Sequence, residues 1–280
     1  MLDLKDKPIW GVAILDRELF VLTQTTSKID VYNTKTFVFK RRILTTLVNP
    51  RDIVSCSRNR CLYVIDWKEK FTQKEIARLD PSGVVIREWV TGEDKGLLSI
   101  SSDANIILTV TKKRMLKEYS PEGQLIREVS LSPDASSPWH AVKLTNNNFV
   151  VSKDDDRLHT VSVVDSDGQT VQSFIREGDT NLKGSVHVVV DRGGTVLLAD
   201  TFKKRVLLLS PDLHYKRVLL SKSHGLNCPV RMQLDESSGR LFVVDNEYDY
   251  FSRGKWRDGR ILVFDIGKIT EENVRSSSMR

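Results

Sequence analysis

The stretch Thr195–Leu209, TVLLADTFKKRVLLL, holds two apolar runs separated by a short polar loop that follows Asp200 and ends at Arg205. Short leucine- and valine-rich runs bounded by polar residues are typical of buried β-strands. The stretch therefore predicts two neighbouring strands joined by a loop. The chain returns to the same pattern along its whole length.

The run that ends at Asp200 has counterparts at intervals of about 42 to 47 residues, the period of a four-stranded propeller blade rather than of a helical solenoid. Periodic repetition of one supersecondary unit indicates that the units stack to bury a common core. The six runs, including the reference run, are LFVL from Leu19, LYVID from Leu62, IILTV from Ile106, FVVS from Phe149, VLLAD from Val196 and LFVVD from Leu241.

Each run has an apolar segment before it and a β-branched or aromatic segment after it, and a tight turn then leads into a fourth segment. Proline presets φ in such turns and glycine accepts a positive φ, so they predict hairpins. The turns are DPSG from Asp80, SPEG from Ser120, DSDG from Asp165 and SPDL from Ser210. The sequence therefore predicts an all-β fold, a six-bladed β-propeller of four-stranded antiparallel blades. The expected blades are approximately 8–45, 50–91, 95–131, 138–177, 183–221 and 227–266.

The sixth blade lacks a fourth strand, because the chain after Asp265 is polar. A propeller must close its ring, and the spare segment is at the N-terminus. We therefore expect residues 1–7 to be the closing strand, with Leu2–Lys7 paired as the outer strand of the sixth blade. The expected organisation is one propeller domain over 1–268 and a disordered tail over 269–280.

Composition limits the class of protein. The chain has 280 residues, 40% of them hydrophobic, and it holds neither the run of about 18 apolar residues that a membrane helix needs nor the layout of a secretory signal. We expect a soluble, cytoplasmic, monomeric protein without membrane contact. Its three cysteines, Cys56, Cys61 and Cys228, lie among apolar strand residues and are expected to be buried free thiols.

Residues 184–209, GSVHVVVDRGGTVLLADTFKKRVLLL, resemble an NHL repeat, in which an apolar run ending in Asp and Gly precedes a strand ending in Asp and an Arg-Ile/Val step. The sixth blade, PVRMQLDESSGRLFVVDN, and the second blade carry parts of the same pattern, whereas Lys203 stands where the family usually has Asn. The matching residues are Asp191, Gly193, Asp200, Arg205, Val206, Pro229, Asp235, Gly239, Asp245, Pro50, Asp66 and Ile76.

The resemblance implies a binding platform. NHL propellers often form the C-terminal part of TRIM-NHL proteins, where they bind RNA or protein while other modules supply ubiquitin ligase activity. The zinc-binding Cys/His arrays and heptads of those modules are absent from this chain. Ligase activity is therefore not expected in it.

The loops between second and third strands are expected to emerge on one face and to carry a net charge of about +9, while the whole chain carries +6. Lysine and arginine suit phosphates or acidic side chains, and aromatic rings among them suit unpaired bases or protein hot spots. Ordinary solvation of loop lysines, together with a bracing role between neighbouring blades for the arginine that begins the third strand, explains the same charges. The candidate residues are Lys68, Lys70, Lys112, Lys113, Arg114, Arg157, Lys203, Lys204, Arg205, Tyr250, Arg253, Lys255, Trp256 and Arg257.

The partner expected at this face is a protein or, as an alternative, single-stranded RNA. The insert from Asn246, NEYDYFSRGKWRDG, has the Tyr, Trp and Arg content of an interface anchor, although a segment covering the closing strand would look similar. We expect no enzyme activity, no cofactor and no metal, because no GxSxG, phosphate-loop or HExxH motif is present.

One position of the first strands is expected to line the central channel. Two imidazoles on adjacent blades are compatible with zinc, as in some six-bladed lyases and lactonases, but catalytic zinc normally takes three protein ligands and no third histidine stands at this position. A hydrogen-bonded channel lining is the competing interpretation. The residues at this position are Val12, Asp52, Ser99, His140, His187 and Arg231.

Overall fold

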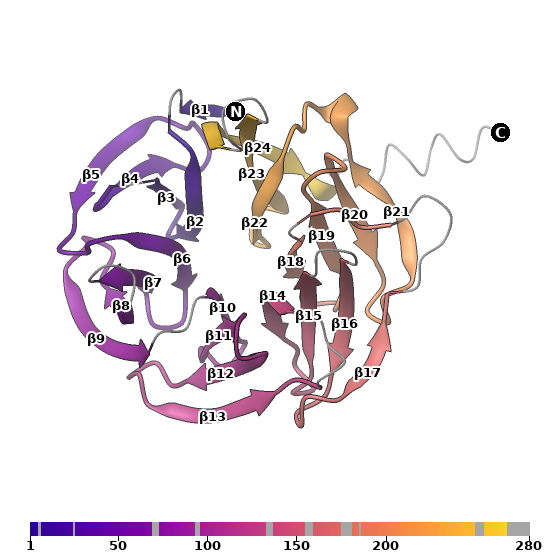
Figure 1. Ribbon diagram of the computed structural model, residues 1–280. Helices are drawn as coiled ribbons and strands as arrows, with labels where there is room; N and C mark the ends of the chain where they lie inside the picture. The colour runs from indigo at the N-terminus through magenta and orange to yellow at the C-terminus, as the bar shows by residue number, and fades with distance from the viewer. Residues whose placement is uncertain are drawn as a thin grey trace.

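The computed structural model describes residues 1–4, 7–24, 26–68, 73–92, 96–132, 137–154, 159–174, 181–184, 186–249 and 255–267. Within them the strands form six four-stranded antiparallel sheets arranged as a ring (Figure 1). The propeller predicted from the repeat is confirmed, with its blades in chain order around the axis.

The first three blades are built from consecutive strands, each paired with the next. Blade one contains β2 (Ile9–Leu15), β3 (Glu18–Thr23), β4 (Lys28–Asn33) and β5 (Phe39–Leu44). Blade two contains β6 (Pro50–Cys56), β7 (Cys61–Lys68), β8 (Gln73–Leu79) and β9 (Val85–Gly92). Blade three contains β10 (Gly96–Ile100), β11 (Ile106–Val110), β12 (Met115–Tyr119) and β13 (Leu125–Ser130).

The last three blades repeat this plan until the ring closes. Blade four contains β14 (Ser137–Lys143), β15 (Phe149–Asp154), β16 (Thr160–Val164) and β17 (Thr170–Ser173). Blade five contains β18 (Val186–Val190), β19 (Val196–Asp200), β20 (Arg205–Leu209) and β21 (Tyr215–Leu220), and a 3-10 turn η2 (Lys222–His224) follows it. Blade six contains β22 (Pro229–Asp235), β23 (Arg240–Asp249), β24 (Lys255–Asp265) and β1 (Leu2–Leu4).

The N-terminal strand closes the ring as predicted, although it spans Leu2–Leu4 and Lys7 lies outside it. Leu2 pairs with Ile261 and Leu4 with Gly259, so β1 is the outer strand of blade six (Figure 1). Asn246 of blade six accepts a hydrogen bond from Ile9 N at 3.0 Å and donates one to Ile9 O at 3.0 Å. Blade six is therefore fastened to blade one by side-chain as well as strand contacts.

The core is divided among the blade interfaces. Each of six buried clusters draws its residues from two neighbouring blades, as Ala13, Leu22, Ile53 and Val64 do between blades one and two. A sheet buries both faces only if a neighbour covers each one, so closing the ring completes the burial. The last cluster joins blades six and one around Phe242.

The turns between third and fourth strands have the predicted geometry. Gly83, Gly123 and Gly168 take φ values of 95°, 81° and 84°, which a side chain rarely adopts. In the turn from Ser210, Leu213 takes a φ of 57° instead, and its buried side chain packs in the cluster between blades four and five. Packing therefore holds a leucine where the turns of blades two, three and four use glycine.

Two predicted loops are strands in the structure. The insert that follows Asn246 was expected to be a loop, but β23 and β24 continue as a ladder to the pair Asp249 and Lys255. In blade two the ladder continues to the pair Lys68 and Gln73. Aromatic residues, which favour strands, occur in these arms at Trp67, Tyr248 and Trp256. The expected tail, 269–280, lies outside the described residues.

Candidate recognition face and axial channel

Two cavities occupy the axis of the ring. The turn-side cavity, of about 580 Å³, reaches the turns between first and second strands at Asp16, Ser57 and Glu236. The loop-side pocket, of about 430 Å³, is lined by Trp67, Thr111 and Lys112, among others. Arg231 lines both, so its side chain lies where the two cavities meet.

The loop-side pocket shows that connections from different blades share one face. Its walls include the ends of the second strands or the loops after them in four blades, at Trp67, Thr111, Thr201 and Asn246. We call this side of the ring the loop face. The exposed cations Lys112, Lys113 and Arg114 lie in the β11–β12 turn on it.

Several predicted face residues are engaged within the propeller. Lys68 forms ion pairs with Glu75 at 2.5 Å and Glu88 at 3.0 Å, which neutralise its charge locally. Lys204 donates a hydrogen bond to Asn227 Oδ1 at 2.8 Å and so bridges blades five and six. Arg205 is 9% exposed, and its guanidinium donates to Asp200 Oδ2 at 2.9 Å.

The Asp at the end of the second strand explains the repeated motif. Asp200 accepts Lys183 N at 2.9 Å from the connection that enters its own blade, in addition to the bond from Arg205. Asp66, also fully buried, accepts Val48 N at 2.9 Å and Asn49 N at 2.6 Å. The same arrangement recurs in blade six, where Asp245 accepts Asn227 N, Cys228 N and Arg260 Nε. The motif is therefore a structural brace for the connection between blades.

The remaining predicted face residues are half-buried, exposed or outside the described set. Lys203 is half-buried and Arg257 is exposed. The backbones of Lys255 and Trp256 belong to β24, opposite Asp249 and Tyr248, and their side chains are not among those described. Lys70, Arg157, Tyr250 and Arg253 lie outside the described residues.

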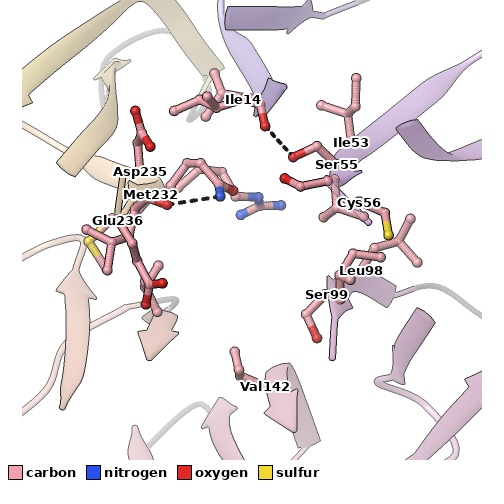
Figure 2. Close-up of a pocket in the computed structure, with 18 of the residues that line it drawn as sticks. Ile14, Ile53, Ser55, Cys56, Leu98, Ser99, Val142, Met232, Asp235 and Glu236 are labelled. Carbon is pink, nitrogen blue, oxygen red and sulfur yellow. Dashed lines mark hydrogen bonds between the residues drawn. The ribbon is translucent and has the colours of Figure 1, made fainter. Parts of the chain in front are cut away.

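The structure brings together the residues expected in the channel. Val12, Asp52, Ser99, His140, His187 and Arg231 all line the turn-side cavity, one from the first strand of each blade. Figure 2 shows this cavity, with Ser99 and Val142 on different strands and Asp235 and Glu236 on the far side from Ser99. Ser55 Oγ donates to Ile14 O at 2.7 Å, a bond from blade two to blade one that is drawn in Figure 2.

Most of these side chains bind the backbone of the next blade. Asp52 accepts Leu98 N at 2.9 Å, Ser99 Oγ donates to Ala141 O at 2.6 Å, and His140 Nδ1 accepts Val188 N at 3.3 Å. His187 Nδ1 accepts Met232 N at 3.3 Å in the same way. These bonds make the position a hydrogen-bonded lining of the channel.

The tautomers of the two histidines oppose zinc binding. Because Nδ1 of His140 and of His187 accepts an N–H, the proton of each neutral ring is on Nε2, which then has no lone pair for a metal. His140 Nε2 lies 3.3 Å from Leu98 O, the acceptor that this tautomer requires. The rings stack with their centroids 4.0 Å apart. In the described part of the chain, His, Cys, Asp and Glu side chains form no cluster of three suited to a metal.

Burial dominates the electrostatics of the ring. Desolvation lowers the pKa of His140 to about 3, assisted by the positive charge of Arg231, and it lowers the pKa of His187 well below its ordinary value. Desolvation also raises the pKa of Asp52, against the attraction of Arg231. Arg231 Nε lies 3.6 Å from Asp52 Oδ1, a loose ion pair at the junction of the two cavities.

The other sequence expectations have these outcomes. Cys56, Cys61 and Cys228 are buried and free, as predicted. Sequence reasoning missed Trp10, Arg51 and Trp139 as pocket residues. No helix in the described part of the chain has the length and hydropathy to cross a membrane.

Comparison with known proteins supports the fold. The WD40 β-propeller domain of Doa1 superimposes with a TM-score of 0.60 and 13% identity over 93% of this chain and 84% of that one. A protein of unknown function from Bacteroides caccae superimposes with a TM-score of 0.55 and 12% identity over 76% of this chain and 81% of that one. No family model and no curated protein matches the sequence. These likenesses concern the propeller architecture alone.

Proposed function

We propose that the chain is a non-catalytic recognition module that binds a protein partner on its loop face. The observation that carries the proposal is the loop-side pocket, a concave site at the centre of a face with exposed lysines and arginines. Ligand and partner sites in closed β architectures commonly lie at such central openings. The propeller domain of Doa1, to which the fold is similar, makes an interaction role a reasonable expectation.

The non-catalytic part of the proposal rests on the hydrogen bonds of the channel residues. His140 uses both ring nitrogens in contacts to neighbouring blades, at Val188 N and Leu98 O, so it is not available as a general base. Asp52 and Ser99 are likewise engaged with backbone groups of the next blade. The ring therefore holds the blades together rather than offering a set of reactive groups.

Single-stranded RNA is the second candidate for the same face, because Lys112, Lys113 and Arg114 are exposed near aromatic residues. The aromatic rings themselves favour protein. Arg51 and Lys74 lie 4.8 and 5.3 Å from the centre of the Trp67 ring, and a Cβ on Gly184 would come within 2.4 Å of the Phe202 ring. Part of each ring is occupied by these contacts, so the surface that still lines the pocket suits one inserted side chain better than a series of stacked bases.

The proposal also assigns the propeller to an NHL-like family. The buried pair of Asp200 with Arg205, and the pair of buried Asp245 with half-buried Arg260, give a physical role to the residues that resemble the NHL pattern. We therefore keep an NHL-like propeller, related to the recognition domains of TRIM-NHL proteins, as part of the proposal. A monomeric, cytoplasmic protein is the form in which we expect it to act.

The test compares two variants of equal charge change. Lys112→Glu/Lys113→Glu reverses two exposed charges on the loop face, and Lys35→Glu/Arg58→Glu reverses two exposed charges in turns at the opposite end of the strands. Crosslinking and affinity capture from lysate, with and without ribonuclease, should show a protein band lost only in the loop-face variant. A band lost after ribonuclease treatment of wild type would favour RNA, and equal capture by both variants would refute the loop face.

A further inference from the structure

The loop-side pocket has an aromatic wall created by strand irregularities. In four first strands the register shifts by one residue, between Ile9 and Gly11, Pro50 and Asp52, Pro138 and His140, and Pro229 and Arg231. A bulge leaves its extra residue unpaired and redirects the side chain. The extra residues are Trp10, Arg51, Trp139 and Val230, and all of them line the pocket.

These side chains meet further rings from the second-strand ends. Trp67 and Phe202 complete the wall, and Ile9 and Leu97 add aliphatic surface. The guanidinium of Arg51 lies 4.9 Å from the centre of the Trp10 ring and 4.8 Å from that of Trp67, so the arginine is stacked between two indoles. Cation–π contacts of this kind hold the three side chains in fixed relative positions.

The charge of the pocket has one sign. Its lining residues include Arg51, Lys112 and Arg231, and no aspartate or glutamate is among the described residues that form its wall. The turn-side cavity differs, since Asp16, Asp52, Asp235 and Glu236 line it. A concave site with cations and low-dielectric walls concentrates negative charge from solution.

The floor of the pocket holds a buried cation that is incompletely paired. Arg231 is 9% exposed, its Nη1 donates to Val230 O at 2.9 Å, and its Nε makes no hydrogen bond. Its nearest carboxylate, that of Asp52, stands 3.6 Å away on the other side of the junction. A buried charge with unused donors favours an approaching anion.

From these features we infer that the loop-side pocket takes an apolar, preferably aromatic, side chain from a partner segment whose flanking residues are acidic. The inference rests on the proposed function and names the chemistry of the partner at that site. A pocket of about 430 Å³ has room for one large side chain and part of its backbone. The acidic neighbours would then contact Lys112 at the rim and the exposed Lys113 and Arg114 beside it.

The experiment uses the whole chain and synthetic peptides without tryptophan. Three of the five tryptophans of the protein line the pocket, so tryptophan fluorescence reports its occupation. The probe is a blocked pentapeptide with a central phenylalanine between two acidic residues on each side. Matched peptides replace the phenylalanine by serine or the acidic residues by lysines. Loss of the ring should weaken binding by about tenfold or more, and the reversed charges should abolish it.

Two variants test whether the phenylalanine peptide binds in the loop-side pocket. Thr111→Phe fills the cavity from its wall without removing a charge and should abolish the response, and Lys112→Met should weaken binding by about threefold to tenfold. Lys35→Met, in an exposed turn between β4 and β5, is the matched control and should bind as wild type does. Melting curves of each variant establish that it is folded.

The possible results distinguish the inference about the loop-side pocket from the proposed function of the loop face. Equal binding of the phenylalanine and serine peptides, or an unchanged response in a folded Thr111→Phe protein, would overturn the inference. Displacement of the probe by a mixed-sequence RNA oligonucleotide at equal or lower concentration would overturn it in favour of nucleic acid. If the peptide fails to bind while Lys112→Glu/Lys113→Glu still abolishes capture of a protein, the proposed function survives and the pocket inference does not. If the peptide binds specifically but no protein is captured from lysate, the pocket inference survives and the proposed function does not.

Discussion

The stacked histidines of the channel predict a loss of stability in mild acid. His140 and His187 are buried as neutral rings, whereas both gain a proton in the unfolded chain when the pH falls below about 6.5. A lowered pKa in the folded state means that the stabilisation is complete above the unfolded value and disappears as the pH falls towards the folded value. Acid therefore favours the unfolded chain over this range.

The magnitude follows from the pKa of His140. With a folded value of about 3 and an ordinary value of 6.5, this side chain alone costs roughly 1.4 kcal/mol per pH unit below 6.5, or about 2 kcal/mol at about pH 5. His187 adds to the loss in the same direction. Asp52 has a raised pKa and acts in the opposite direction, so a comparison must hold it constant.

The assay is urea unfolding at about pH 7 and about pH 5, followed by tryptophan fluorescence and circular dichroism. The variant His140→Asn keeps an acceptor near the position of Nδ1 for Val188 N but does not titrate. It should remove about 2 kcal/mol of the pH dependence while Asp52 remains in both proteins. Equal pH dependence in wild type and a folded variant would refute the view that this imidazole is neutral and buried.

Further perturbations test the braces, the ring closure and the glycine at the seam. Asp200→Ala leaves the buried Arg205 without its carboxylate and should cost about 3 kcal/mol or more, whereas Asp16→Ala, at an exposed pair, should cost less than about 1 kcal/mol in the same urea titration. Asn246→Ala removes both hydrogen bonds to Ile9 and should lower stability by about 2 kcal/mol, and a change below about 0.5 kcal/mol would contradict the role given to it. Gly259→Ala places a Cβ 2.6 Å from Lys7 O and 2.6 Å from Ile9 Cγ1, so calorimetry should show a lower Tm, and an unchanged Tm would show that Lys7 and Ile9 do not lie against Gly259 as the structure has them.

Much of the fold was accessible from the sequence because a propeller repeats one short-range unit. The second strand of each blade is a recurring apolar run, and aligning the first strands that precede these runs placed Asp52, His140 and His187 at one position, where they line one cavity in the structure. The closing role of the N-terminal strand followed from counting, since blade six lacked a strand in the sequence. The local strand pattern and the need to close the ring were together sufficient to predict the blades, the channel position and the closing strand.

The pocket was not accessible in the same way, because a bulge is set by pairing between strands rather than by composition. Trp139 and Arg51 reach the pocket since the register shifts next to them. A usable signal existed in Pro50, Pro138 and Pro229, each just before the extra residue, because proline lacks the N–H that a regular ladder needs.

The engagement of Lys68 and Arg205 with particular carboxylates was also hidden, although a bracing role for the arginine that begins the third strand was one of the alternatives. It depends on which carboxylates the fold places beside them, namely Glu75 and Glu88 for the lysine and Asp200 for the arginine. Counting charges in loops treats such residues as equally available. The loop charge of the sequence therefore overstates the charge that a partner meets.

The pairing of Leu2 with Ile261 has a consequence for biosynthesis. Within the propeller, β1 precedes all the other strands in the chain and pairs with the last of them, so the contact between blades six and one stays open until β24 has been synthesised. During that interval Phe242 and Ile261 lack their final cover. In concentrated refolding mixtures the same seam can accept the leading strand of a neighbouring molecule, and strand-exchanged dimers are the misassembly that this architecture favours.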